Sequence, residues 1–473
     1  MQVLLGLKDF GKIKSAEVDI SRFSVFVGNN NSGKTYVMQL IYGIRENLIK
    51  YLHDKDLYER YLVQFEEQAE DGKITLDAES MKTLEKFLNE ILQKYKEKII
   101  LDTFFEEIEI SQIYVRFLIE ENEKFELLFF HGNDHGEKWD DVFEHLSKDE
   151  KIGVVQRDKD LRTSQIDETV FTMRVFRIMN ENRKLIQSYM FPAKFMQSLL
   201  GQIPGEFMLD FSPGNLFLPA SRTGLLMLYK EFFASKADET VKMLRLEENN
   251  RDYIKYRKMN ITQPVYDFLR FLQTFTPELN ALKKEDLIQF IEEHLIEGRI
   301  LIDQRNQPVY QTQGAQRGFP LYLSSSMVNE LTPILYVLQS ALQPGKLIWD
   351  EIETSLHPQK QMELARLLSR MCNAGFSMIV STHSDSMAAK INNLCLLSFS
   401  QSLNGKRAEI LKKSGLEEAD LFKERIHVYQ FENSDSGKSL VRELEYDEVT
   451  GYQFSLFQDA VEKLFQETRL ILE

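Results

Sequence analysis

One short segment near the start of the chain has the residue types and spacing of a phosphate-binding loop. It runs from Gly28 to Thr35 and fits the pattern G-x-x-x-x-G-K-[ST]. In such a loop the glycines let backbone N–H groups wrap the phosphates, the lysine neutralises the outer phosphates, and the last hydroxyl reaches Mg²⁺. We therefore predict ATP and Mg²⁺ as ligands. The predicted nucleotide-binding residues are Gly28, Asn29, Asn30, Asn31, Ser32, Gly33, Lys34 and Thr35.

The segments on either side of the loop have the order that a phosphate site requires. A dense apolar run ends at Gly28 and predicts a buried strand. After the loop, the apolar residues between Val37 and Leu48 recur at helical spacing, so a helix is predicted to begin at Lys34. The positive end of that helix's dipole favours bound phosphate. This placement argues against the alternative that the loop is a flexible surface turn.

Two adjacent carboxylates follow a second apolar run. Leu347–Trp349 predicts a buried strand, and Asp350 and Glu351 come directly after it. A P-loop needs an acidic partner for the metal and, for hydrolysis, a base for the attacking water. We predict that Asp350 holds Mg²⁺ together with Thr35, and that Glu351 orients and polarises the water. An apolar strand that ends in Asp-Glu is common as a solvated strand end, and the upstream loop favours the functional interpretation.

A histidine follows the next predicted strand. The apolar segment Ser377–Val380 leads to His383, and a helix predicted at about 359–373 joins it to the strand before Asp350. Strands joined through one helix favour a parallel crossover, and ligands gather at the carboxyl ends of such strands. A lone histidine is more often structural. Its predicted position beside Asp350 favours contact between His383 and the γ-phosphate.

Longer segments of the chain must position these residues. Residues 1–28 predict paired strands, 50–100 an inserted helical arm, and 299–310 a hairpin. Residues 225–297 are helical and charged, and a lever, a coiled arm and a compact lobe all fit their pattern. The expected division is an N-terminal half of the nucleotide-binding unit at 1–220, a helical lobe at 221–297, a C-terminal half at 298–400, and a tail with a terminal helix at 401–473.

The composition excludes several classes of protein. The chain has 473 residues, of which 43% are hydrophobic, so it can bury a large core. Its net charge of -15 argues against a surface that binds nucleic acid throughout and leaves room for a local basic groove. The two cysteines, Cys372 and Cys395, cannot build a disulfide scaffold or a cysteine metal site. The start of the chain lacks the features of a secretory signal, and no apolar run reaches the roughly 18 residues that span a membrane. We expect a cytoplasmic protein without membrane contacts.

The order of these elements resembles the ABC-type ATPase heads of the RecF, SMC and OLD group, especially the bacterial AAA-type ATPases allied to OLD proteins that often serve anti-phage defence. Phe10–Ile13 before the loop and Glu351–Pro358, which is similar to the family stretch E-P-E-A-H-L-H-P, carry the resemblance. It implies an α/β P-loop NTPase of ABC-head type with a mixed and parallel sheet, an N-terminal antiparallel part and a helical insertion lobe. It also implies that Glu351 is the catalytic glutamate, that Glu353–His357 signal between subunits, and that His383 is the switch histidine.

A serine-rich element corresponds to the family's L-S-G-G-Q-like element. Leu323–Met327 stands at that place, and two serines occupy positions where glycines are usual. The resemblance implies that Ser324, Ser325 and Ser326 contact the ATP of a second subunit. A second interpretation is that these serines cap the helix that follows, a role that serine fills well. The two roles are compatible.

The segment Pro219–Gly224 resembles the family's P-A-S-R-T-G segment, where ABC ATPases have a glutamine loop that faces the metal. No glutamine is present in it. Arg222 is therefore open to two interpretations: a contact to phosphate or between lobes, or an ordinary ion pair.

The function that the resemblance implies is an ATP-driven switch. ATP bound to one subunit would be covered by the serines of another, so the chain would form a dimer or a larger homo-oligomer. The residues after His383 are too few for a TOPRIM nuclease domain, so a separate nuclease or toxin would be the effector. The alternative is an ATPase of DNA maintenance that clamps DNA.

Overall fold

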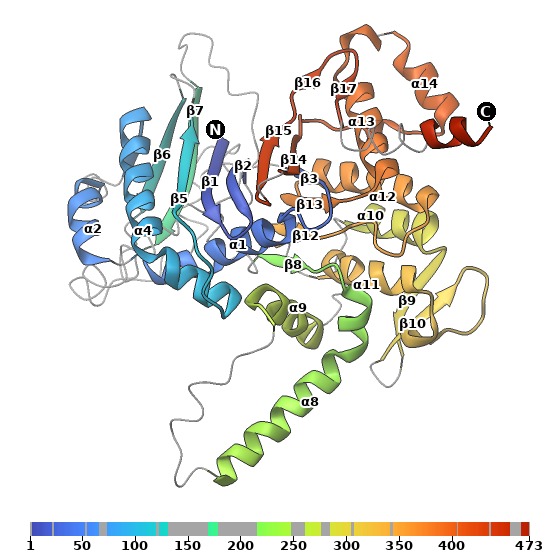
Figure 1. Ribbon diagram of the computed structural model, residues 1–473, viewed down its shortest axis with the longest axis horizontal. Helices are drawn as coiled ribbons and strands as arrows, with labels where there is room; N and C mark the ends of the chain where they lie inside the picture. Colours follow the sequence, from blue (N-terminus) through green and yellow to red (C-terminus); the bar gives the residue numbers. More distant parts are fainter. Residues whose placement is uncertain are drawn as a thin grey trace.

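A nine-stranded mixed β-sheet runs through the protein, in the strand order β5-β1-β2-β15-β14-β3-β13-β12-β8 (Figure 1). Its strands are β1 (Gln2–Phe10), β2 (Ile13–Asp19), β3 (Ser24–Gly28), β5 (Gln112–Leu118), β8 (Leu216–Leu218), β12 (Leu347–Trp349), β13 (Met378–Thr382), β14 (His427–Asn433) and β15 (Ser439–Glu443). The structure, a computed structural model, describes residues 2–20, 23–52, 54–65, 73–119, 123–130, 169–177, 215–246, 261–275, 284–303, 307–340, 344–403, 405–434, 437–454 and 465–472.

The sheet has a parallel part and an antiparallel part. Neighbouring strands pair in parallel from β14 through β3, β13 and β12 to β8. All residues of β3, β12 and β13 are buried, as expected for parallel strands that are covered on both faces. β1 pairs antiparallel with both β2 and β5. The prediction of an α/β fold with a mixed and parallel core and an N-terminal antiparallel part is confirmed.

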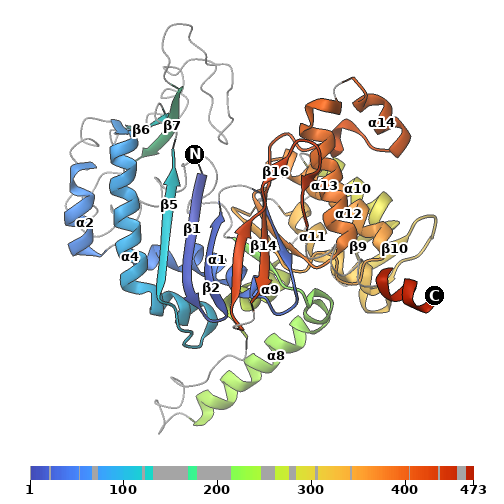
Figure 2. The ribbon, with the colours of Figure 1, turned by 45° about the horizontal axis from the view of Figure 1, so that its top comes forward.

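Neighbouring residues of β3 point into two separate hydrophobic cores, because side chains alternate along a strand. Phe26 packs in the core with α1 (Lys34–Asn47) and α4 (Ala78–Phe104). Val25 and Val27 pack in the core with α11 (Ser326–Gln339), α12 (Pro358–Asn373) and α13 (Asp385–Phe399). Figure 2 shows α4 on one side of the sheet and α12 and α13 on the other. Helices therefore cover both faces, and the strand before the loop is apolar throughout.

The segment predicted as a helical arm packs against the sheet. It contains α2 (Lys55–Tyr61), β4 (Lys73–Leu76) and α4. The Asn89 side chain of α4 bonds both the N–H and the carbonyl of Val115 in β5. β4 belongs to a second sheet with β6 (Glu123–Phe130) and β7 (Thr169–Arg177). α4 is thus a layer of the N-terminal half.

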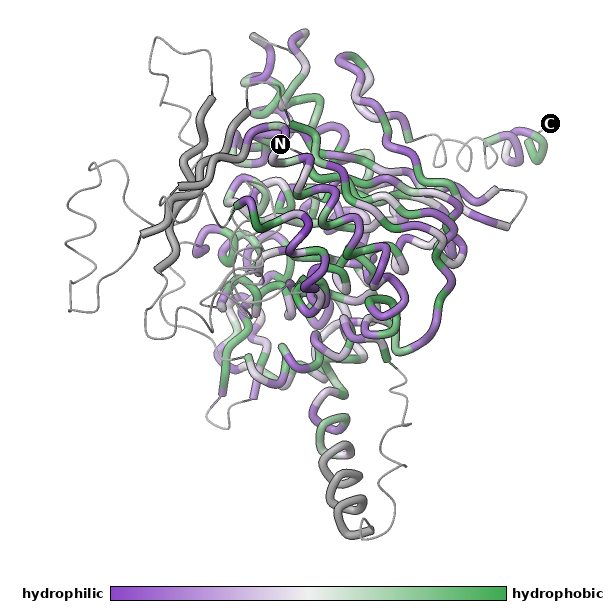
Figure 3. The backbone as a smooth tube through the Cα atoms, turned by 90° about the vertical axis from the view of Figure 1, so that its left-hand side faces the viewer, coloured by the Kyte–Doolittle hydropathy of each residue, from purple (hydrophilic) through white to green (hydrophobic). Residues whose placement is uncertain are grey.

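The helical lobe combines a projecting helix with packed ones. α8 (Arg222–Leu246) extends away from the body in Figures 1 and 3, whereas α9 (Gln263–Thr274) packs against β8 and α1. α10 (Glu285–Phe290) continues into the π-helical turn η4 (Ile291–Leu295). The predicted hairpin follows as β9 (Gly298–Ile302) and β10 (Pro308–Thr312), which pair antiparallel, and the short β11 (Phe319–Pro320) and η5 (Leu321–Leu323) lead to α11. The described part of the segment 225–297 thus contains both a projecting helix and packed helices, and the choice among lever, coiled arm and compact lobe stays a prediction.

The C-terminal part is more than a tail. β14 and β15 insert between β3 and β2, in the middle of the sheet. The pairing joins segments far apart in the sequence, such as Ser24 with His427 and Ile13 with Ser439, so local sequence patterns do not reveal it. The remaining elements are α14 (Arg407–Ser414) and the small hairpin of β16 (Tyr446–Asp447) and β17 (Gly451–Tyr452). A terminal helix is described at 465–472, and its residues are exposed.

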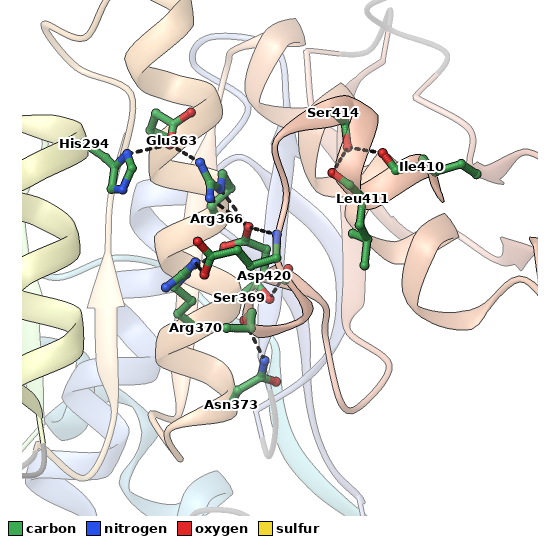
Figure 4. A network of polar contacts seen from close by, with 12 residues as sticks. His294, Glu363, Arg366, Ser369, Arg370, Asn373, Ile410, Leu411, Ser414 and Asp420 are labelled. Atoms are coloured by element: carbon green, nitrogen blue, oxygen red, sulfur yellow. Dashed lines mark hydrogen bonds and ion pairs between the residues drawn. The ribbon is translucent and has the colours of Figure 1, made fainter. Parts of the chain in front are cut away.

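A buried carboxylate anchors this C-terminal part to α12 (Figure 4). Asp420, in the 3-10 turn η7 (Glu418–Asp420), is fully buried and forms ion pairs of 2.9 Å with Arg366 and 2.7 Å with Arg370. Both arginines come from the same face of α12. Among the described residues, no helix is long and apolar enough to cross a membrane.

Candidate active site

The predicted site residues that follow strands meet at one edge of the sheet. The loop Gly28–Thr35 follows β3, Asp350 and Glu351 follow β12, and His383 follows β13. β13 pairs in parallel with both β3 and β12, so the three carboxyl ends lie side by side. The sequence predicts the β12–β13 pairing, and β3 is the other neighbour of β13 in the structure.

The loop has a backbone that only certain residues allow. Gly28 has φ of 143° and Gly33 has φ of 94°. A Cβ on Gly28 would lie 2.3 Å from the carbonyl oxygen of Phe431, so no side chain fits there. Gly33 is the N-cap of α1, which starts with Lys34. The loop therefore curls tightly onto the start of the helix, as a phosphate cradle requires.

Lys34 lies folded across this loop. Its Nζ donates to the carbonyl oxygens of Gly28 and Asn29, both at 2.9 Å, and lies 3.4 Å from Nδ1 of His383. Burial lowers the pKa of the Lys34 ammonium to about 8, although nearby carboxylates, Asp350 first among them, favour its charged form. Lys34 Nζ also donates to Ser32 Oγ at 3.3 Å, so these hydrogen-bond acceptors are uncharged groups, and a buried cation of this kind is well prepared to bind a phosphate anion.

Asp350 and Thr35 form the group that fits a hard cation. Thr35 Oγ1 donates to Oδ2 of Asp350 at 2.7 Å, and Ser381 Oγ donates to Oδ1 at 2.5 Å. Burial raises the pKa of Asp350, and the two hydroxyl donors oppose this by stabilising the carboxylate. Hydroxyl and carboxylate oxygens are the ligands that Mg²⁺ prefers. Within the described residues, no group of three or more His, Cys, Asp or Glu side chains is placed to hold a metal ion.

Glu351 and His383 face each other. Oε1 of Glu351 lies 3.5 Å from Nε2 of His383. The hydrogen bond from His383 lowers the pKa of Glu351 and outweighs its partial burial, so the carboxylate is ionised at neutral pH. The backbone N–H of His383 donates to Oε1 of Glu353 at 2.5 Å. The imidazole of His383 thus has Glu351 at Nε2 and Lys34 at Nδ1, and Glu353 holds its backbone N–H.

Arg222 has both of the features that the sequence left as alternatives. Its side chain is completely buried, and Nε lies 2.8 Å from Oε2 of Glu330. Its Nη1 donates to the carbonyls of Pro219 (2.9 Å) and Asp350 (2.6 Å), and its Nη2 donates to the carbonyl of Glu351 (3.1 Å). It is an ion-pair residue and also a contact between α8, α11 and the end of β12.

The three serines lie at the start of α11. Ser325 is its N-cap and accepts from the N–H of Val328 at 3.4 Å, while Ser324 Oγ donates to the carbonyl of Leu321 at 2.6 Å. Ser325 and Ser326 are exposed. In the described part of the chain, these serines make no hydrogen bond to the loop Gly28–Thr35. The capping interpretation is therefore confirmed for Ser325, and the contact to a second subunit stays a prediction.

Three residues beside the loop were not singled out from the sequence. Lys12 Nζ donates to the carbonyl of Asn31 at 2.5 Å, and Asn433 Nδ2 lies 3.5 Å from the carbonyl oxygen of Asn30. Ser381 holds Asp350, as described above. Lys12 lies within Phe10–Ile13, so the family resemblance was a signal for it. Asn433 has no such signal, because the pairing of β14 with β3 brings it to the loop.

Several solved structures of SMC head domains align with this chain at low sequence identity. An SMC head bound to the C-terminal winged-helix domain of ScpA aligns over 94% of this chain and 98% of its own, with 13% identity and a TM-score of 0.36. The head domain from Thermotoga maritima aligns over 94% and 100%, with 12% identity and a TM-score of 0.33. The head from Pyrococcus furiosus, with an extended coiled coil and bound to a domain of ScpA, aligns over 98% of both chains, with 13% identity and a TM-score of 0.33. No curated protein matches the chain.

A family model decides the classification. The model of the AAA ATPase domain matches residues 4–388. The match includes the loop, both carboxylates of the β12 end and His383, the groups that the structure brings to one edge. The chain belongs to the AAA ATPase domain family.

Proposed function

We propose that the protein is a magnesium-dependent ATPase that acts as a switch, with each ATP site completed by a second copy of the chain. The convergence of Lys34, Thr35, Asp350, Glu351 and His383 on one sheet edge carries this proposal. Between them these residues provide a cation for the phosphates, oxygen ligands for a metal, and a carboxylate for the attacking water.

Each residue has one task in hydrolysis. The N–H groups of Gly28–Thr35 and the Lys34 ammonium bind the outer phosphates. When it does so, Lys34 leaves the carbonyl oxygens of Gly28 and Asn29 and contacts the phosphate instead. Thr35 and Asp350 would hold Mg²⁺, which neutralises charge on the phosphates. The ionised carboxylate of Glu351 accepts a proton from the water while the water oxygen forms a bond to the γ-phosphorus and the bond to ADP breaks. His383, next to Lys34, donates a hydrogen bond to a γ-phosphate oxygen.

The start of α11 has the properties of a surface that meets a second copy. Ser325 and Ser326 are exposed beside the positive end of the α11 dipole, which suits a phosphate. The residues just before them are apolar and exposed, Tyr322 at 68% and Leu323 at 64%. Exposed apolar side chains that cluster in one place are typical of interaction sites. These features support the placement of Ser324–Ser326 over the ATP of another subunit.

The proposal also includes a role for the switch, which is supported by the resemblance of Glu351–Pro358 to the stretch of OLD-allied ATPases. The switch controls a separate effector protein, such as a nuclease or a toxin, in defence against phage. ATP binding brings copies together, and hydrolysis releases them. A role in DNA maintenance, with DNA clamped between copies, is the competing outcome of the test below.

The test uses Glu351→Gln, which keeps the shape of the side chain and removes the base. We expect its turnover to fall by about 100-fold or more, because a general base contributes factors of this order. ATP binding remains, so the variant stays in an ATP-bound assembly that light scattering detects. Glu363→Gln is the matched control, since Glu363 pairs with Arg366 on α12, outside the site. Turnover of Glu351→Gln at the wild-type rate would remove Glu351 as the base.

The same variant identifies what the switch controls. Affinity purification of Glu351→Gln with ATP, followed by mass spectrometry, detects protein partners and bound nucleic acid. A nuclease or toxin that co-purifies only with ATP supports the defence function. DNA without a protein partner favours the maintenance function.

A further inference from the structure

Arg222 and Glu330 form an ion pair in the interior of the protein. The side chain of Arg222 is 0% exposed and that of Glu330 is 3% exposed. Removing two charges from water is costly, and apolar residues of similar volume often stabilise a fold as well as such a pair does. The pair is therefore poorly explained by stability alone, and its other contacts indicate its role.

On one side, the pair reaches the backbone of Glu351. Arg222 donates to the carbonyls of Asp350 and Glu351, and its guanidinium lies 5.6 Å from the ring centre of Trp349. The last residue of β12 and the two carboxylate residues after it thus share one buried cation. The planar guanidinium can bond several carbonyls at once, which an ammonium cannot do in the same way.

The backbone of Glu351 needs such support. Its φ is 45°, in the left-handed region that residues with a side chain seldom occupy. Its N–H donates to Ser381 Oγ at 2.8 Å, and its carbonyl accepts from Thr354 Oγ1 at 2.9 Å as well as from Arg222. The direction of the Glu351 carboxylate therefore depends on contacts to its own main chain.

On the other side, the pair reaches the start of α11. Glu330 lies one turn after Ser326, and its Oε1 accepts from the N–H of Thr223 at 3.1 Å. The hydroxyl of Thr223 donates to the carbonyl of Ser326 at 3.4 Å. The first turns of α8 and α11 are thus bonded to each other next to Ser324–Ser326, and a shift of α11 also moves Arg222.

We infer that Arg222 and Glu330 connect the start of α11 to Glu351, so that contact of a second copy with Ser324–Ser326 sets the position of the catalytic carboxylate in the same subunit. Arg222 is a positioning residue, because it touches the main chain of Glu351 and not the reacting atoms. The inference rests on the proposed function, in which Ser324–Ser326 meet another subunit and Glu351 is the base. It adds that assembly activates hydrolysis in the subunit that supplies the serines.

The main test removes the charges and keeps the volume. In Arg222→Met/Glu330→Met, two apolar side chains replace the pair, and the fold is expected to persist. We expect kcat to fall about 10- to 100-fold, because small displacements of a catalytic group have effects of this size. The KM for ATP should change by less than about threefold, since the groups that bind phosphate are untouched. A merely structural role would change the unfolding temperature and KM together with kcat.

The dependence on assembly is the second measurement. Wild-type turnover per chain should rise with protein concentration as copies associate. Copies of the triple variant Arg222→Met/Glu330→Met/Glu351→Gln should still associate with one another when ATP is present. The double variant, which keeps Glu351, should have a low turnover that no longer rises with protein concentration. If Glu351→Gln alone does not associate with ATP, the proposed function fails. If association is normal and the double variant keeps the wild-type kcat and its concentration dependence, the connection through Arg222 fails.

Arg222→Lys decides the matter if the double variant does not fold. It keeps the charge and loses the planar set of donors, so we expect the same fall in kcat at nearly constant KM. The matched control is Arg366→Lys, which changes another buried arginine that pairs with a buried carboxylate, Asp420, away from the site (Figure 4). The control should lower the unfolding temperature and leave kcat unchanged. An equal loss of kcat in both lysine variants would overturn the inference.

Discussion

Gly28 shows how closely the nucleotide loop depends on a distant strand. A Cβ added at residue 28 would lie 2.3 Å from the carbonyl oxygen of Phe431 in β14, and the φ of Gly28 is 143°. In the motif, residue 28 is a glycine because the backbone must come close to the phosphates. The structure adds a second reason, the close contact with the backbone of β14.

Gly28→Ala is therefore expected to harm both stability and binding. Overpacking of this kind costs about 1–3 kcal/mol of unfolding free energy, and the displaced loop should bind ATP more weakly. Gly375→Ala is the control, because Gly375 also has a positive φ, of 88°, but its added Cβ meets no atom within 4 Å. Chemical denaturation and ATP titration measure both effects. Equal losses of stability in the two variants would show that backbone strain, and not the contact with Phe431, is responsible.

Most of the chemical residues could be predicted from the sequence because each follows a buried strand within a short, local pattern. Lys34, Asp350 and His383 are of this kind, and the structure brings them together as expected. The residues that position them, such as Arg222 and Ser381, are harder to predict from the sequence. Arg222 lies 129 residues from Glu351, whose carbonyl it binds, and Ser381 lies 31 residues from Asp350. Such contacts depend on the tertiary fold, so a local pattern does not contain them.

At the scale of elements, Asp54 joins two helices of the N-terminal half. It is the N-cap of α2, where it accepts from the N–H of Leu57, and its Oδ2 lies 2.5 Å from both Lys94 Nζ and Tyr95 Oη of α4. Burial alone would raise the pKa of Asp54, but the hydrogen bonds from Lys94 and Tyr95 outweigh it and hold the pKa below its usual value.

Asp54→Ala is expected to lower the unfolding free energy by about 0.5–2 kcal/mol, the usual effect of losing an N-cap. The folded pKa of Asp54 is below the unfolded one. Its contribution is therefore complete above the unfolded pKa of about 3.9 and is lost as pH falls through the folded pKa. Denaturation of both proteins between neutral pH and about pH 3 should show a difference that shrinks in acid. A difference that stays constant with pH would exclude the charge of Asp54 as its source.

Elements with strong periodicity could be predicted well, and elements defined by their partners could not. The helix α1 and the hairpin β9–β10 lie where the sequence pattern placed them. The segment 50–100 was expected to be an inserted arm because it is charged and helical, yet α4 packs on β5 through a buried apolar stripe. The pattern of such a helix shows that one face is buried but does not show which element covers it.

At the scale of the whole molecule, the exposed apolar residues before α11 indicate where copies meet. Tyr322→Asp places a charge on that surface without touching the loop Gly28–Thr35. We expect ATP binding to be normal and ATP-dependent assembly of the Glu351→Gln protein to be lost, because a buried unpaired charge is costly. Light scattering with and without ATP measures assembly. Val449→Asp is the control, since Val449 is 78% exposed and lies in the turn between β16 and β17. Assembly that survives Tyr322→Asp would place the contact elsewhere.

The insertion of β14 and β15 between β2 and β3 also determines when the site can form. β2 and β3 lie within the first 28 residues, whereas β15 ends at Glu443. During translation, the facing edges of β2 and β3 lack these partners until β14 and β15 have been synthesised, and unpaired edges invite wrong pairing. The β14 backbone behind Gly28 arrives just as late. The nucleotide loop is thus synthesised about 400 residues before the strand that completes its surroundings, since Gly28 pairs with Phe431.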